Sequence, residues 1–156
     1  MADDAVASIQ ATVLPDEIAK VISATMTVTP ADANDKWYYK LTSVSNSSTD
    51  LIAGSYIDYT AVDDDTGFTA VSTSDKIKLL FIKNVDTNSR SIYICFDGGT
   101  AASDLVDGVT IGPNEFFIAR IPNTTVANLH AISSDIGDTG DATANLIVAA
   151  LIDDVA

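Results

Sequence analysis

The stretch that decides the fold runs from Asp75 to Arg120 and contains three short apolar runs. They are KIKLLFIK at Lys76–Lys83, SIYICF at Ser91–Phe96 and EFFIAR at Glu115–Arg120. Each run is rich in β-branched and aromatic residues and is bounded by Asn, Asp, Gly or Pro, the sequence pattern of β-strands. In the first run, apolar side chains fall on both faces, which is typical of a strand that is covered on both sides. We therefore expect these three strands to form the centre of a sheet inside a sandwich.

Alternation of apolar and polar residues, or a run of apolar or aromatic residues, predicts further strands on either side of the three runs. In chain order they are 6–14, 20–29, 37–44, 51–62, 68–72, 109–111, 126–133 and 143–151. The last of these is rich in Ala and also fits a helix, but a strand is favoured. Gly112-Pro113-Asn114 predicts a tight hairpin turn that folds Ile111 back against Phe116. Short strands at regular intervals with turn residues between them are typical of an all-β sandwich, and eight-stranded jelly rolls are the nearest standard form.

A chain of 156 residues fits one domain, and it is long enough to bury a core without disulfides. We expect residues 15–156 to form a single antiparallel β-sandwich domain that is jelly-roll-like. Residues 1–14 are expected to be an extended N-terminal arm, because apolar and polar residues alternate there up to Pro15. Such an arm adds a strand to the sheet edge of a partner or of a neighbouring subunit.

The charge balance excludes two classes of partner. The chain has 22 acidic and 8 basic residues, which gives a net charge of -14. An excess of this sign repels nucleic acid phosphates and anionic lipids, so neither is expected to bind. No apolar run approaches the ~20 residues of a membrane span. The N-terminus, with Asp3 and Asp4, lacks the basic start of a secretion signal, so we expect synthesis in the cytoplasm.

Residues that carry reaction chemistry are few. His130 is the one imidazole, and no nucleophile-elbow motif accompanies any Ser, so a catalytic triad is not expected. Cys95, the one cysteine, lies within a predicted strand and is interpreted as a small buried side chain rather than a reactive thiol. Paired carboxylates of the glycosidase kind cannot be located from the sequence, and most Asp residues lie in predicted turns. We therefore expect no enzyme, no catalytic residues and no cofactor.

Two acidic loops are the places where a hard cation would bind. They are Asp63–Gly67 and Asp135–Asp141, and Ca²⁺ prefers six to eight oxygen ligands in flexible loops of this kind. Neither loop has the terminal Glu of an EF-hand, so solvated turns are favoured over a Ca²⁺ site. The sequence leaves this choice open.

Three consecutive aromatic residues, Trp37, Tyr38 and Tyr39, start one predicted strand. Alternation places Trp37 and Tyr39 on one face and Tyr38 on the other. We expect Trp37 in the core, which leaves an interface or a sugar-stacking surface as the alternative use of an aromatic face.

Several segments resemble small virion structural proteins of marine tailed bacteriophages. They are Met26–Lys40, Leu51–Gly54, Asp75–Asn84, Ile92–Gly99 and Ile111–Phe116, and the last two are similar to strand, Gly turn and strand patterns of phage β-sandwich proteins. The resemblance covers most of the chain from Met26 onward, its motifs are structural, and it assigns a role to no residue. In size, acidity and strand content the chain resembles head decoration, or cement, proteins most.

This resemblance implies a structural protein of the virion that binds the outer head surface and stabilises contacts between capsomers. The implied partners are the major capsid protein and further copies of the chain, with a trimer favoured. Three alternatives stay open: a tail or neck structural protein, a carbohydrate-binding β-sandwich module, and an enzyme that gathers His130 with two carboxylates in a cleft.

Overall fold

The computed structural model describes residues 4–14, 18, 20–31, 35–53, 71–87, 90–102, 108–134, 143–153 and 155. Its described strands form an all-β structure, as expected from the sequence, and each ladder between them is antiparallel. The chain divides into two compact units, Met1–Asp32 and Ala33–Ala156. The first unit therefore extends beyond residue 14, the end that the sequence predicted for the arm.

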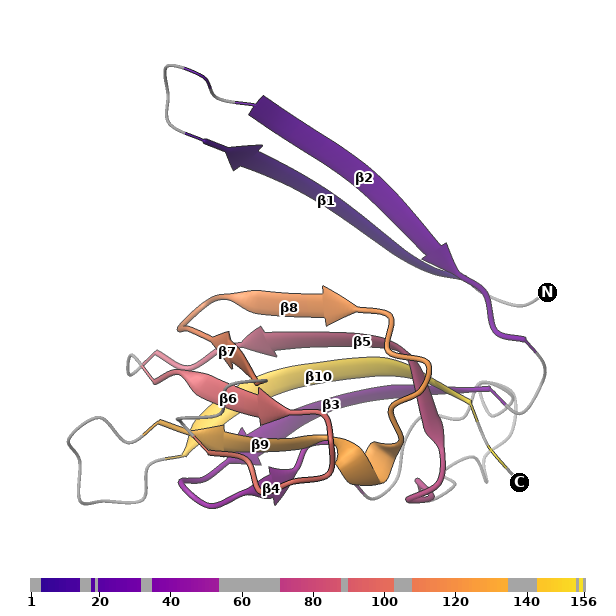
Figure 1. Cartoon of the computed structure of the whole chain (residues 1–156), viewed down its shortest axis with the longest axis vertical. Helices are drawn as coiled ribbons and strands as arrows, with labels where there is room; N and C mark the ends of the chain where they lie inside the picture. Colours follow the sequence, from indigo (N-terminus) through magenta and orange to yellow (C-terminus); the bar gives the residue numbers. More distant parts are fainter. Residues whose placement is uncertain are drawn as a thin grey trace. The chain divides into compact units, whose positions relative to one another are not determined.

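The first unit is a two-stranded hairpin (Figure 1). β1 (Ala5–Val13) pairs with β2 (Lys20–Val28) along its full length, from Ala5 opposite Val28 to Val13 opposite Lys20. Thr, Val and Ile recur in both strands, and β-branched side chains of this kind favour extended backbone. The two segments predicted as separate strands thus pair with each other.

The second unit contains two four-stranded sheets (Figure 1). The first has the order β3 (Lys36–Val44), β10 (Ala144–Asp153), β5 (Lys76–Asn84) and β8 (Phe116–Ala119). The second has the order β4 (Thr49–Asp50), β9 (His130–Ser133), β6 (Ile92–Cys95) and β7 (Val109–Ile111). A short 3-10 helix, η3 (Val126–Asn128), comes just before β9.

One hydrophobic core contains side chains of both sheets. The first sheet contributes Tyr38, Leu80, Ile82, Leu146 and Val148, and the second contributes Ile92, Ile94, Ile111 and Ala131. Burying an aliphatic side chain of this size contributes about 1.5–3 kcal/mol, so these residues dominate the stability of the second unit. No described residue of the hairpin belongs to this core.

The Ala-rich run is a strand, as the sequence favoured. β10 lies between β3 and β5 and pairs with both of them. Its buried residues Ala144, Leu146, Val148 and Ala150 recur every second position, which is the period of a strand and not of a helix. Small side chains at Ala149 and Ala150 do not prevent strand formation, because pairing on both sides fixes the backbone.

The expectation for the three central runs is wrong in one respect. β5 and β8 belong to the first sheet, whereas β6 belongs to the second, so the three strands do not form the centre of one sheet. The predicted hairpin at Gly112-Pro113-Asn114 is wrong for the same reason, because β7 and β8 lie in different sheets. The turn itself is present: the Glu115 amide donates to the Gly112 carbonyl at 3.1 Å, and Asn114 has φ of 62°. Turn residues determine the reversal but not which sheet receives the next strand.

An irregularity in β5 also changes which of its residues face the core. The register shifts so that Leu79 lies opposite Leu151 and Ile77 opposite Ile152, which leaves Lys78 as an extra residue. A bulge of this kind reverses the alternation on one side of it. Ile77 therefore joins Leu80 and Ile82 in the core, although strict alternation placed Ile77 on the opposite face.

Two further strand predictions differ from the structure. Only the second half of 126–133 is a strand, because residues 126–128 form η3, in which the Asn128 amide donates to the Thr125 carbonyl. Alternation does not reveal such a turn. Of the predicted strands 51–62 and 68–72, the described parts 51–53 and 71–72 are not in strands, and the remainder lies outside the described residues.

Candidate functional site

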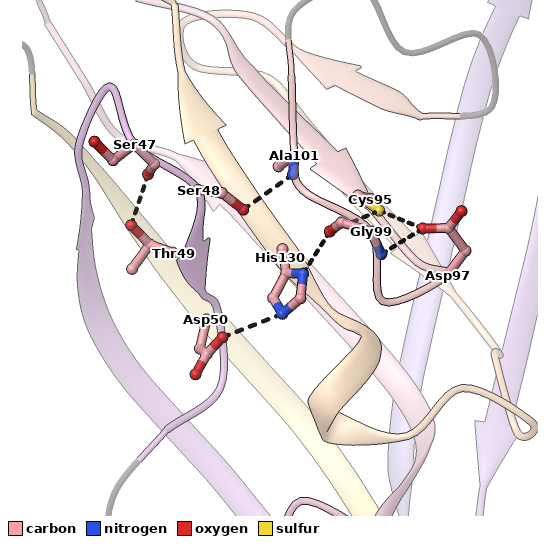
Figure 2. Close-up of polar contacts among 9 residues, drawn as sticks. All are labelled: Ser47, Ser48, Thr49, Asp50, Cys95, Asp97, Gly99, Ala101 and His130. Atoms are coloured by element: carbon pink, nitrogen blue, oxygen red, sulfur yellow. Dashed lines mark hydrogen bonds and ion pairs between the residues drawn. The ribbon is translucent and has the colours of Figure 1, made fainter.

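Polar residues of three separate segments meet beside β9 (Figure 2). The pairing of β4 with β9 brings Asp50 opposite His130, and the pairing of β6 with β9 brings Cys95 opposite the same residue. The turn that follows β6 adds Asp97 and Gly99. His130 and Cys95, which are far apart in the sequence, are thus neighbours, and their geometry decides whether they form a catalytic pair.

His130 uses both ring nitrogens. Nδ1 lies 2.6 Å from the Gly99 carbonyl oxygen, and Nε2 lies 3.2 Å from Oδ1 of Asp50. Both partners are acceptors, so a neutral imidazole donates to one of them and a protonated imidazole donates to both. Neither nitrogen faces Cys95, and His130 therefore links the turn after β6 to β4 and β9.

Cys95 is bonded to the turn and not to the imidazole. Its Sγ lies 2.7 Å from Oδ1 of Asp97 and 3.5 Å from the Gly99 carbonyl oxygen. Burial, reinforced by the hydrogen bond to the Asp97 carboxylate, raises the pKa of the Cys95 thiol. A thiol with a raised pKa is mostly protonated at neutral pH and is a weak nucleophile. The geometry thus agrees with the interpretation of Cys95 as a buried structural residue.

The Asp97 carboxylate stabilises the turn that follows β6. The same carboxylate oxygen that faces Cys95 accepts a hydrogen bond from the Gly99 amide at 2.8 Å, and these two bonds lower the pKa of Asp97. Gly98, which lies between Asp97 and Gly99 in the sequence, has φ of 82°, a left-handed backbone conformation that favours glycine. The arrangement is a side-chain-stabilised turn, in which the carboxylate takes the place of a backbone acceptor.

The acidic loops proposed as cation sites, Asp63–Gly67 and Asp135–Asp141, lie outside the described residues. Within the part of the chain that the structure describes, no group of three or more His, Cys, Asp and Glu side chains is placed to hold a metal ion. Nor does any helix there have the length and apolar character that crossing a membrane requires.

The aromatic residues of β3 differ from the expectation. Tyr38 is the core residue, with 2% of its surface exposed, while Trp37 is half-buried and Tyr39 is 62% exposed. Tyr38 lies opposite Ala150 and faces inward with it, so the small Ala150 side chain leaves room for the ring. The expectation that Trp37 occupies the core is therefore wrong, because the two-residue period allows only one of the two faces to be the core.

Two exposed apolar surfaces are the remaining candidates for function, and the sequence pointed to a part of each: the N-terminal arm, and an aromatic face of the strand that starts at Trp37. The first is one face of the hairpin, where Ile9 and Ile22 are 45% and 55% exposed. The second is the outward face of the first sheet, where Tyr39, Leu41 and Phe116 are exposed. Alternation predicted each strand, but it does not distinguish an apolar face that packs on the core from one that is left uncovered.

No family model matches the chain, and no curated protein or solved structure matches it either. The comparisons therefore assign no role to any residue beyond what the geometry provides.

Proposed function

We propose that the protein is a structural component of a tailed-phage virion, specifically a capsid decoration protein that binds the outer head surface. Its partners are then the major capsid protein and further copies of the chain. The observation that carries this proposal is the hairpin unit Met1–Asp32: its described strands contribute no residue to the core cluster of the two sheets, and Val28 is the one buried residue in them. A two-stranded hairpin of this kind is stabilised when a partner molecule packs against one of its faces or edges.

The physical reason is the low stability of isolated hairpins. Two strands alone are marginally stable in water, and they become stable when a third strand or another surface covers them. β1 and β2 each have nine residues, and between Ala5 and Val13 there is no Pro and no charged residue to block pairing at the outer edge. Uninterrupted edges of this length add to other sheets. The hairpin thus suits a protein that attaches to a preformed lattice.

We also infer that the second unit is a jelly roll. In support, its eight described strands form four nested pairs: β6 with β7, β5 with β8, β4 with β9 and β3 with β10. A long antiparallel ribbon with these nested pairs, rolled so that its strands alternate between two sheets, gives the observed orders β3-β10-β5-β8 and β4-β9-β6-β7. Jelly rolls recur in viral capsid proteins and also in lectins.

The chemistry of the described residues supports a structural role over an enzymatic one. Cys95 donates to Asp97, and His130 contacts Asp50 and Gly99, so these contacts connect segments of the fold. A decoration protein needs no active site, but it must stay soluble before it binds. The net charge of -14 supports that requirement, because like-charged copies repel each other in solution.

The test is to measure the copy number of the chain in purified phage particles by quantitative mass spectrometry against the major capsid protein. A decoration protein is present in a fixed ratio of the order of the capsomer number, and capsids lose it when residues 1–32 are deleted. A tail or neck protein, the alternative, is present in far fewer copies. Absence of the chain from purified particles contradicts both.

One observation favours a second candidate, a carbohydrate-binding module. Tyr39 is 62% exposed and shares its face of β3 with the half-buried Trp37, and exposed aromatic rings stack on sugars. Titration with a panel of glycans tests this candidate. Binding that is lost in Tyr39→Ala but kept in Tyr93→Ala, a half-buried tyrosine on β6, supports it, and no binding to any glycan contradicts it.

A further inference from the structure

Three ionisable side chains meet at one end of the first sheet. Asp35 directly precedes β3, Lys78 is the extra residue of the bulge in β5, and Asp153 ends β10. β10 lies between β3 and β5 and is antiparallel to both, so the start of β3, the start of β5 and the end of β10 share this end of the sheet (Figure 1). The fold thus gathers one amine and two carboxylates from segments that are far apart in the sequence.

The Lys78 amine is in close contact with the whole Asp35 carboxyl group. Its Nζ lies 2.8 Å from Oδ1 and 2.7 Å from Oδ2. An atom this close to both oxygens also lies within about 3.5 Å of the carboxyl carbon between them, which is the separation of a near-attack arrangement. The last torsion of an Asp side chain is soft, so the carboxyl plane is free to turn its face toward Nζ. The amine is therefore placed to attack the carbon as well as to pair with the oxygens.

The bulge in β5 is what directs the amine to this place. Ile77 and Leu79 lie opposite Ile152 and Leu151 of β10, and Lys78 is the residue inserted between them. Bulges are over-represented beside reactive sites, where the extra residue lets the strand aim one side chain in a new direction. Here the side chain that is aimed belongs to a lysine, and its target is Asp35.

Both members of the pair are shielded from water. The Asp35 side chain has no exposed surface, and the Lys78 side chain is 19% exposed. Charges that have lost their hydration are costly, and transfer of one proton from Nζ to the Asp35 carboxylate removes both charges without moving a heavy atom. The result is a neutral amine, which is a nucleophile, beside a neutral acid. The ion pair and a reactive pair thus differ in the position of one proton.

Asp153 is the third group at this site. Its Oδ2 lies 3.6 Å from the same Nζ, and its side chain is 37% exposed. A carboxylate in this position accepts a proton from the attacking amine and returns it to the departing oxygen, which is general acid–base catalysis. Because Asp153 is partly exposed, it also borders the solvent into which a released water molecule passes.

We propose that Lys78 and Asp35 condense to an intramolecular amide, with Asp153 as the proton relay. The lone pair of Nζ forms a bond to Cγ of Asp35, and the electron pair of one Cγ–Oδ bond leaves with its oxygen. Of the three protons of the Lys78 ammonium group, one stays on the amide nitrogen and two leave with this oxygen as water. The reaction needs no oxidant and no second reactant, and the structure holds the pair before it has reacted. This bond goes beyond the proposed function, since it forms within one isolated chain.

The amide would tie β3 to β5 across β10. It joins residues that are 43 positions apart in the sequence, and a cross-link of this kind restricts the unfolded chain. Asp35 also lies just after the boundary between the two units, since the second unit begins at Ala33. Tension applied to the first unit would then reach β5 directly and would not peel β3 away from β10.

The first experiment is intact-mass spectrometry of the full chain after unfolding in denaturant. We expect a mass that is lower than the sequence mass by one water molecule. Digestion with trypsin is expected to release residues 21–36 joined to residues 77–83, with the chain uncut after Lys78. Lys78→Arg keeps a positive charge but has no amine to condense, so it is expected at full mass. Lys76→Arg, a change at an exposed position of the same strand, is the control and is expected to lose one water.

Two further variants test the roles assigned to the carboxylates. Asp35→Asn is expected to lose one ammonia molecule in place of one water, because the leaving group is then the side-chain amide nitrogen. Asp153→Asn keeps the Lys78–Asp35 pair and is expected to slow bond formation at least about 100-fold, followed as the mass of freshly purified chain during incubation at neutral pH. Asp153→Glu, which keeps a carboxylate, is expected to restore part of the rate. An Asp153→Asn chain that condenses as fast as the unaltered chain would overturn the relay.

An unaltered chain that keeps its full sequence mass would overturn the proposal, because the contact would then be an ion pair only. A lost water that maps to Asp97-Gly98 or Asp107-Gly108 would overturn it too, since ring closure at an Asp-Gly sequence gives the same change in mass. Both outcomes are distinguishable from failure of the proposed function. The amide is measured on the isolated chain, whereas the virion role is measured by copy number in particles.

Discussion

At the scale of single residues, Lys78 connects an irregularity of the backbone to a buried charge. It is the extra residue of the bulge in β5, and its Nζ lies 2.8 and 2.7 Å from the two carboxylate oxygens of Asp35. Asp35 has no exposed surface, and Asp153 approaches the same ammonium at 3.6 Å. Because a buried carboxylate is costly without a cation, the bulge and the ion pair depend on each other.

Replacing Lys78 by Met is expected to destabilise the protein by about 3 kcal/mol, because it removes one partner of a largely buried pair. The change is measured as the free energy of unfolding in urea at neutral pH. Lys83→Met, an exposed position on the same strand, is the control and is expected to change stability by less than about 0.5 kcal/mol. Equal effects of the two substitutions would show that the Asp35 contact does not stabilise the fold.

The raised pKa of the Cys95 thiol predicts how the free energy of unfolding changes at alkaline pH. Its thiol has a raised pKa in the folded protein, so in the unfolded chain it loses its proton at lower pH. The contribution of the Cys95 thiol to the free energy of unfolding is fully present below about pH 9, and it is lost as the pH rises through the pKa of the folded state. Urea unfolding at about pH 8, 9 and 10 measures it. Cys95→Ser is expected to show a shallower loss over this range, and an unchanged pH dependence would contradict the assignment.

At the scale of elements, the sequence predicts well where strands lie, but it predicts poorly which strands pair with each other in a sheet. Alternation predicted β1 and β2, apolar or aromatic runs predicted β3, β5 and β10, and turn chemistry predicted the reversal at Gly112-Pro113-Asn114. It did not reveal that the chain crosses to the other sheet after that turn, because sheet membership depends on contacts between distant residues. The bulge at Lys78 and the short helix η3 were missed for a related reason, since both interrupt a two-residue period without a Gly or Pro to mark them.

The hairpin is expected to be independent of the second unit in stability. Deletion of residues 1–32 removes no residue of the core cluster that the two sheets share, and Val28 is the one buried residue in the described strands of the hairpin, so the midpoint and slope of urea unfolding should stay close to those of the full chain. In the same proteins, amides of β1 and β2 should exchange with solvent faster than those of β5 and β10, because an isolated hairpin opens readily. A large loss of stability on deletion would show that the hairpin belongs to the folded core.

At the scale of the whole molecule, the net charge of -14 leads us to expect that any association of copies depends on salt concentration. The screening length falls from about 30 Å at 0.01 M salt to about 3 Å at 1 M. Both the free energy of unfolding and the fraction of associated chain are therefore expected to rise with NaCl concentration over this range. Sedimentation velocity and urea unfolding at matched salt concentrations measure the two quantities, and a salt-independent association would contradict the charge argument.

Composition and charge were sufficient to exclude nucleic acid and membrane partners from the expectations, but they did not locate a binding surface. The exposed apolar face of the hairpin and the exposed outward face of the first sheet both follow from registers that only the structure supplies. Tyr39 and Phe116, for example, lie on one face of the first sheet because β10 and β5 connect their strands. His130 and Cys95 were the residues that the sequence offered for inspection as reaction chemistry, and no catalytic role was expected for either. Their relation was not predictable, because it depends on the pairing of β9 with both β4 and β6.

The central claim is that this protein works by attaching through its N-terminal hairpin to a larger assembly. The most direct measurement is cryo-electron microscopy of purified phage heads incubated with the full chain or with the chain lacking residues 1–32. We predict ordered density for the full chain on the outer head surface, with the hairpin covered by a neighbouring molecule, and no such density for the truncated chain. Equal occupancy by both chains, or density in which the hairpin is free in solvent, would contradict the account.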